Sequence, residues 1–132
     1  MPLEQVHTKP DPYAPYLLSQ AIRAGGFLFV SGQAGVGDDG AIVGRDDFDA
    51  QAEQAFSNLR RALQAGGSGL DRVVKVTIFL TSMAHFPKIV ELRRKWFSAP
   101  YPADTIVEVS ALYSPDAKIE IEAIALATEA AR

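Results

Sequence analysis

Two carboxylates stand in this sequence where strand patterns surround them with apolar neighbours. Asp104 follows Pro-Ala near the start of an alternating segment, Y-P-A-D-T-I-V-E-V (101–109). Glu120 shares one face of a second alternating segment, I-E-I-E-A-I-A (119–125), with Glu122. A carboxylate in an apolar setting can accept or donate a proton in catalysis. Each also has a simpler interpretation, because polar residues open strands and carboxylates usually lie on a solvated face.

A third candidate is the end of the apolar run F-V-S-G-Q (29–33). The hydroxyl of Ser31 and backbone amides left open by Gly32 could hold a small carboxylate or an oxyanion. The alternative is a plain strand end that leads into a turn. Residue types and spacing leave both interpretations open.

Composition restricts the class of protein. The 132 residues correspond in size to one domain, 1–132, and 48% of them are hydrophobic and 22% charged, as in ordinary globular proteins. The net charge of −3 offers no basic excess for phosphates, which argues against nucleic acid as a main partner. The absence of cysteine excludes disulfides and thiolate chemistry. We expect a soluble, cytoplasmic protein without a membrane span or signal peptide, because the apolar runs are short.

The other polar motifs favour structural interpretations. His7 and His85 are predicted to be solvated, and they do not assemble into a metal cluster or a catalytic triad. The glycine loop 35–40 lacks the Lys-Ser/Thr pair of a phosphate-binding loop. The sequence therefore predicts no metal site.

Strand periodicity predicts six strands, the first two joined as a hairpin by R-A-G-G. The strand patterns lie at 17–22, 27–31, 41–43, 74–80, 105–109 and 118–127. The segment 8–16, which is rich in proline, is predicted to be an extended lead-in.

Helical periodicity predicts two helices between these strands. The first begins after Asp46 or Asp47 and ends at Gly66-Gly67. The second spans about 85–97, and its predicted inward residues are Phe86, Ile89, Val90, Leu92 and Trp96.

This order of elements predicts an α+β sandwich, one mainly antiparallel sheet with two helices on one face. The second face of the sheet would lack cover within the chain. Its predicted apolar residues are Val73, Phe79, Ile106, Ile124 and Leu126. We therefore expect the sheet to pack against other subunits.

Six ordered segments together resemble the RidA/YjgF family, sometimes labelled endoribonuclease L-PSP. They are S-Q-A-I (19–22), F-V-S-G-Q (29–33), N-L-R-R-A-L-Q-A-G-G (58–67), V-V-K-V-T-I-F-L (73–80), P-A-D-T-I-V-E-V (102–109) and I-E-I-E-A-I-A (119–125). The resemblance implies a chorismate-mutase-like fold and a homotrimer whose sheets form a central barrel, with small-molecule clefts between neighbouring subunits. It also implies hydrolysis of reactive enamines and imines, such as 2-aminoacrylate, without a metal or organic cofactor.

The resemblance assigns roles to some residues of this chain. Ser31 matches the family's serine, and Glu120 matches the glutamate that positions the hydrolytic water. Leu18 stands in place of a tyrosine and Val90 in place of an asparagine. Asp104 replaces the arginine of P-A-R-S/T, which binds the substrate carboxylate.

These replacements define the expected site. Glu120 and Asp104 are the expected catalytic residues, and the expected substrate-binding residues are Ser31, Gly32, Leu18, Val90 and Ile106. If Asp104 and Glu120 lie within several ångströms of each other, the two carboxyls titrate jointly and can divide acid and base roles, or together hold a cationic amine. The roles of Tyr13 and Tyr16 stay open.

The leading functional hypothesis is a cofactor-free hydrolase acting on a small imine, enamine or related nitrogen compound. We expect it to be a poor 2-aminoacrylate deaminase, because Asp104 would repel the substrate carboxylate. The alternative is a non-catalytic trimeric protein that binds a small regulatory metabolite. A ribonuclease has less support, because the chain is acidic and has no pair of neighbouring histidines.

Overall fold

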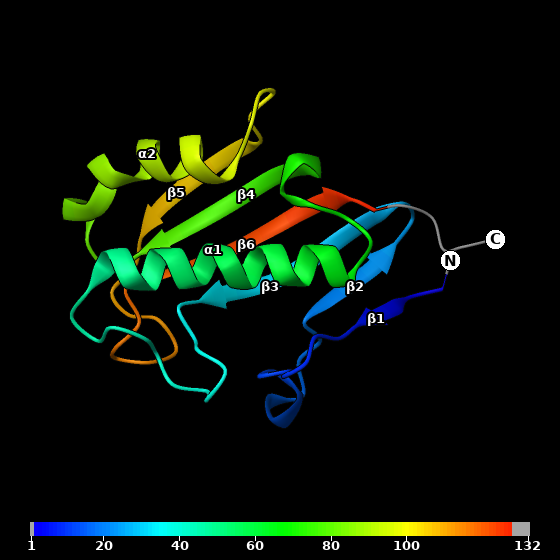
Figure 1. Ribbon diagram of the computed structural model, residues 1–132, viewed down its shortest axis with the longest axis horizontal. Helices are drawn as coiled ribbons and strands as arrows, with labels where there is room; N and C mark the ends of the chain where they lie inside the picture. The colour runs from blue at the N-terminus through cyan, green and yellow to red at the C-terminus, as the bar shows by residue number, and fades with distance from the viewer. Residues whose placement is uncertain (1, 128–132) are drawn as a thin grey trace.

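The computed structural model describes residues 2–127, which form one six-stranded sheet and two α-helices (Figure 1). In chain order the elements are β1 (Glu4–Val6), β2 (Ala21–Ala24), β3 (Phe27–Ala34), α1 (Phe48–Ala65), β4 (Val73–Leu80), α2 (Phe86–Trp96), β5 (Ala103–Glu108) and β6 (Ile119–Leu126). Short 3-10 helices lie at Ala14–Tyr16, Leu70–Arg72 and Met83–His85. No helix within 2–127 has the length and apolar character that a bilayer crossing needs.

The strand order in the sheet is β1-β2-β3-β6-β4-β5. Neighbouring strands run antiparallel except β4 and β5, which are parallel. The predicted α+β fold with one mainly antiparallel sheet is confirmed.

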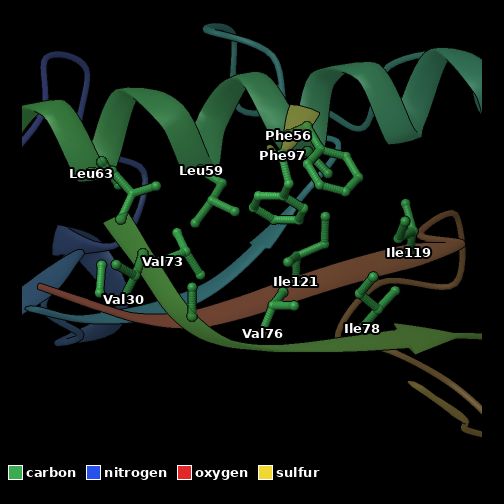
Figure 2. Packing of buried hydrophobic residues seen from close by; sticks show 14 of the residues in the cluster. Val30, Phe56, Leu59, Leu63, Val73, Val76, Ile78, Phe97, Ile119 and Ile121 are labelled. Atoms are coloured by element: carbon green, nitrogen blue, oxygen red, sulfur yellow. The ribbon is translucent and has the colours of Figure 1, made fainter. Parts of the chain in front are cut away.

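Both helices lie on one face of the sheet, and the hydrophobic core lies between them and the strands (Figure 1). Phe56, Leu59 and Leu63 of α1 point toward the strands (Figure 2). They meet fully buried residues of the sheet, among them Ile78 and Ile121. Removing these side chains from water is the main stabilising term in such a core.

Local chemistry explains where α1 begins and ends. The side chain of Asp47 accepts a hydrogen bond from the backbone N–H of Ala50 at 3.1 Å, so Asp47 rather than Asp46 is the N-cap. The helix ends at Gly66, whose N–H donates to the carbonyls of Ala62 and Leu63, and Gly67 follows with φ of +80°. Glycine adopts that left-handed conformation without a steric penalty.

The predicted hairpin is confirmed, with its strands shifted along the chain. Ala24 pairs with Phe27 across the two-residue loop Gly25-Gly26, where both φ values are positive, at 58° and 82°. This conformation suits the right-handed twist of a tight hairpin. The first strand begins at Ala21 rather than at Leu17, which has a left-handed φ of 60° and ends a 3-10 helix.

One predicted strand is absent, and one observed strand was not predicted. The segment 41–43 forms no strand, because only an isolated bridge joins Val36 and Ile42 within the glycine-rich loop. The strand β1 was missed, because its three residues are too few to show a periodic pattern.

Several side chains face differently from the sequence prediction. Phe86 and Val90 of α2 are exposed, whereas Ile89 is fully buried as predicted. Val73 lies in the core and Ile106 packs against it, so neither belongs to the uncovered face. Asp104 and Ile106 are the inward-facing residues of β5. They face inward because they pair with the buried Val76 and Ile78 of β4.

The face of the sheet opposite the helices carries exposed apolar side chains. Phe27 and Phe29 of β3 alternate with the buried Leu28 and Val30, and Leu126 lies opposite Phe27. Phe27, Phe29 and Leu126 are 40%, 46% and 42% exposed, respectively. Phe27 and Phe29 lie two residues apart on the same side of β3, and Leu126 pairs with Phe27 across the sheet. The three side chains therefore form an apolar surface, which we call the outer face.

Candidate active site

A pocket of about 600 Å³ opens where β3, β6 and the proline-rich N-terminal segment meet. This volume lies within the roughly 300–1,000 Å³ typical of small-molecule sites. The lining residues are Pro12, Tyr13, Pro15, Tyr16, Leu18, Ser31, Gly32, Ala34, Val36, Gly40, Tyr113 and Glu120. Four of the residues expected from the sequence therefore meet here, namely Glu120, Ser31, Gly32 and Leu18.

The pocket wall depends on an irregularity between β3 and β6. Val30 pairs with Ala123 and Gln33 pairs with Ile121, so Ser31 and Gly32 together lie opposite the single residue Glu122. One strand thus carries an extra residue, as in a β-bulge, a feature that often re-aims side chains at functional sites.

Gly32 provides the space that Glu120 occupies. A side-chain Cβ built at Gly32 would overlap the carboxylate oxygen Oε1 of Glu120. The carboxylate therefore lies directly against the backbone of β3 and would have to move if residue 32 carried a side chain.

The surroundings of Glu120 make its negative charge unfavourable. Burial raises the pKa of the Glu120 carboxyl, and the neighbouring charge of Glu122 raises it further. A carboxyl whose pKa is moved upward toward neutrality is better suited to exchange protons with a substrate or a water molecule.

Two tyrosines approach this carboxyl from separate loops. The Tyr13 hydroxyl donates a hydrogen bond to the carbonyl oxygen of Gly32, and the backbone N–H of Tyr13 donates to Asp11 Oδ1 at 3.0 Å. The pKa values of Tyr13 and Tyr113 are both raised, mainly because the two hydroxyls are buried. The negative charge of Glu120 raises both pKa values further. Both hydroxyls therefore stay protonated beside Glu120.

Sequence reasoning left the role of Tyr13 open and did not identify Tyr113 as a site residue. Prolines 10, 12 and 15 around Tyr13 were the available signal, because they stiffen the segment that carries the ring to the pocket. Tyr113 lies in the loop between β5 and β6, and its spacing shows no periodic pattern. Only the return of that loop to the mouth of the pocket brings it beside Glu120.

Ser31 is already engaged with the neighbouring chain segment. Its hydroxyl donates to the carbonyl oxygen of Ser19 at 2.7 Å, and its backbone N–H donates to the carbonyl oxygen of Gln20 at 3.0 Å. In this arrangement Ser31 anchors the start of β2 against β3, and its hydroxyl proton is not directed at a ligand.

Asp104 lies apart from Glu120 within the chain. Asp104 pairs with the buried Val76 and faces the helices, whereas Glu120 pairs with Phe79 and faces the opposite side of the sheet. Asp104 does not line the pocket, and neither do Val90 or Ile106. The two carboxyls are therefore not brought together within one copy of the chain.

Arg93 neutralises Asp104. Its Nε donates to Asp104 Oδ2 at 2.8 Å, and the two side chains are 28% and 13% exposed. The second oxygen, Oδ1, is buried and has no hydrogen-bond partner among the described residues. Asp104, the aspartate of P-A-D-T, is therefore not an isolated negative charge, because Arg93 of α2 supplies a cation.

The described residues, 2–127, contain no group of three or more His, Asp or Glu side chains that could hold a metal ion. His7 is exposed as predicted and contacts Asp11. His85 is partly exposed, and its ring stacks on Phe48 with 4.0 Å between centroids. Burial is the main cause that lowers the pKa of His85.

Comparison with known proteins places this arrangement in a family. The family model described as Endoribonuclease L-PSP matches residues 6–127, nearly the whole chain. A RutC family protein of Pyrococcus horikoshii is 41% identical over 116 residues, which cover 88% of this chain and 90% of that protein. The chain belongs to the RidA/YjgF (endoribonuclease L-PSP) family.

Two further relatives of this RidA/YjgF chain have informative names. A protein of Dermatophagoides farinae named 2-iminobutanoate/2-iminopropanoate deaminase is 35% identical over 115 residues, covering 87% of this chain and 88% of that protein. The crystal structure of RidA from an Antarctic Psychrobacter has a TM-score of 0.84 and 35% identity, covering 93% of this chain and 98% of that chain. The sequence-based assignment to the family is thus confirmed.

The raised pKa of Glu120 in this RidA/YjgF protein predicts a pH-dependent effect of Glu120→Gln on stability. At pH values above the pKa of Glu120 in the folded protein, its carboxylate is charged in both the folded and the unfolded state. That charge destabilises the folded state, where burial disfavours it. Glu120→Gln should therefore raise the melting temperature at neutral and alkaline pH. The gain should disappear as the pH falls below the unfolded-state pKa, where the carboxyl is neutral in both states.

Thermal unfolding of both variants between pH 3 and pH 9 measures this difference. Glu122→Gln removes the same charge from an exposed neighbour and should raise the melting temperature less. If Glu120→Gln raised the melting temperature equally at all pH values, or more in acid, the result would contradict the burial of Glu120.

Because Arg93 and Asp104 form an ion pair, we expect Asp104→Ala to destabilise the folded protein. This change leaves Arg93 partly buried without its partner and should lower the free energy of unfolding by about 1.5–3 kcal/mol. Chemical denaturation measures this loss. Glu91→Ala is the control, because Glu91 pairs with Arg94 at the exposed surface, where a pair contributes about 0–1 kcal/mol. Equal costs for the two variants would contradict a structural role for Asp104.

Proposed function

We propose that this protein is a cofactor-free hydrolase that releases ammonia from a small imine or enamine in the Glu120 pocket. The observation that carries the proposal is the partly buried Glu120 carboxyl, seated against Gly32 in a pocket with Tyr13 and Tyr113 beside it. The deaminase name of the Dermatophagoides relative supports the same reaction class.

In the proposed reaction Glu120 acts as a general base and then as a general acid. It takes a proton from water while the water oxygen forms a bond to the imine carbon, and it passes that proton to the imine nitrogen to give a neutral carbinolamine. Glu120 then takes the proton from the carbinolamine hydroxyl as the C=O bond forms and the C–N bond breaks, and it delivers that proton to the departing nitrogen. The products are a carbonyl compound and ammonia, and Glu120 regains its original charge.

Tyr13 has a positioning role in this proposal. Its hydroxyl proton is used by the carbonyl oxygen of Gly32, so it fixes the backbone on which the Glu120 carboxylate lies. The Tyr113 hydroxyl has a raised pKa and stays protonated, so it is available as a hydrogen-bond donor to the attacking water or the developing oxygen charge.

We further propose that the chain acts as a homotrimer through its outer face. Phe27 and Phe29 would leave water on assembly, and a cleft between subunits would bring the Asp104–Arg93 edge of one copy to the pocket of another. Phe29→Asp should therefore shift the sedimenting species from trimer to monomer, while Leu3→Asp, an exposed residue outside this face, should not. A monomeric wild-type protein in analytical ultracentrifugation would overturn the proposal.

The role of Asp104 changes in this proposal. Asp104 is held by Arg93 in an ion pair, so 2-aminoacrylate or the imino acid formed from it would meet no unpaired cation there. We therefore propose that α-imino acids are poor substrates.

A second function, the binding of a metabolite without turnover, has its own support. The hydroxyl of Ser31 is directed at the carbonyl oxygen of Ser19 rather than into the pocket, so one expected oxyanion donor is not presented. A ribonuclease remains the least supported function, because the pocket presents no histidine and the net charge is −3.

Ammonia release from a panel of imines and enamines tests the hydrolase proposal. Glu120→Gln should lower the rate by about 10²–10⁴-fold, the usual contribution of a general acid–base group. Glu122→Gln, which lies outside the pocket lining, should retain the wild-type rate. Equal rates for wild type and Glu120→Gln would remove Glu120 from the mechanism, and binding without any ammonia release would favour the metabolite-binding function.

A further inference from the structure

The charge of the pocket wall limits what the pocket can hold. Among the pocket-lining residues of the described chain, Glu120 is the single carboxyl group, and none is Lys, Arg or His. An anionic ligand would therefore meet a carboxyl without a compensating cation. A ligand that is positively charged at nitrogen would form a charge-assisted hydrogen bond with the same group.

The rest of the wall is mainly aromatic and aliphatic. Tyr13, Tyr16 and Tyr113 contribute three aromatic rings, and prolines and Leu18 contribute aliphatic surface. Tyr16 and Tyr113 are 71% and 63% exposed, so their rings can still accept a partner. Aromatic faces stack on flat rings and attract cations through their quadrupoles.

The Asp104–Arg93 pair of a second copy would not reverse this charge balance. Arg93 is already bonded to Asp104. The ion pair carries no net charge, so it would not offset the charge of Glu120.

We propose that the pocket selects a flat, ring-bearing amine or imine that is cationic at nitrogen and carries no carboxylate. Its nitrogen lies against Glu120 and its ring against Tyr16 and Tyr113. This inference rests on the proposed function for the identity of the site and adds to it the class of substrate.

Equilibrium binding of small probes to the full-length protein tests this selectivity. Isothermal titration calorimetry with benzylamine, benzoate and methylamine separates the contributions of charge and ring. Benzylamine should bind at least about tenfold more tightly than benzoate, because only the cation can pair with Glu120. It should also bind at least about fivefold more tightly than methylamine, which has no ring for the tyrosines.

Variants assign each contribution to its residue. Glu120→Gln should weaken benzylamine binding by about tenfold or more and leave benzoate binding unchanged or improved. Tyr113→Ala should weaken benzylamine binding by about threefold or more, whereas Tyr113→Phe should retain it, because the ring face is kept. Circular dichroism of each variant confirms that it is folded before binding is measured.

The pH dependence of benzylamine binding is a further check with a defined sign. Binding needs the ionised carboxylate, so affinity should fall as the pH is lowered through the Glu120 titration. Since the pKa of Glu120 is raised, this loss should begin at a higher pH than for an ordinary glutamate. Glu120→Gln should abolish the dependence over that range.

The outcomes separate this inference from the hydrolase proposal. Benzoate binding as tight as benzylamine binding, or no effect of Glu120→Gln on benzylamine binding, would overturn the selectivity. Ammonia release from α-imino acids at rates equal to those of ring-bearing imines would overturn it as well, while leaving the hydrolase proposal intact. Selective benzylamine binding without ammonia release from any imine would instead overturn the hydrolase proposal alone.

Discussion

The central position of β6 in the sheet is the constraint on which the rest of this structure depends. Its inward residues, among them Ile119 and Ile121, are fully buried beneath the helices. Because side chains alternate along a strand, a shift of one residue would expose them and bury the acids between them. Burial of one face of β6 therefore fixes Glu120 on the other face, opposite Ala34 of β3 and Phe79 of β4.

The pocket arises where that fixed register meets a local irregularity. The extra residue in β3 at Ser31-Gly32 interrupts the regular pairing with β6 beside Glu120, and the missing side chain at Gly32 leaves room for the carboxylate. Loops then complete the wall with Tyr13 and Tyr113. The scaffold fixes the acid, and the segments around it set the size and polarity of the space that it faces, as is common when binding groups lie on loops.

Charge compensation distinguishes the two carboxyls of interest. Glu120 has no cationic partner in the pocket, so burial raises its pKa, whereas Asp104 is held by Arg93 from the neighbouring helix. A lone carboxyl in an apolar pocket is suited to exchange protons or to hold a cation, and a carboxyl in an ion pair is suited to fix the packing of a helix on a strand. Residues that look alike in the sequence thus have different chemistry because of what packs against them.

The sequence by itself determined the two helices, most of the sheet, the N-cap region and glycine end of α1, and the family. These features depend on local periodicity and on capping and turn residues, which neighbouring positions in the chain define. It also identified Glu120, Ser31, Gly32 and Leu18, which the structure brings to one pocket.

Only the tertiary structure decided the rest. The contacts of Arg93 with Asp104 and of Tyr113 with the pocket join elements whose relative placement no local pattern records. The face on which Asp104 and Ile106 lie follows from the parallel pairing of β5 with β4, which buries their side under α2. A periodic pattern shows that two faces exist, but only packing against a specific partner shows which face is covered and which charges are neutralised there.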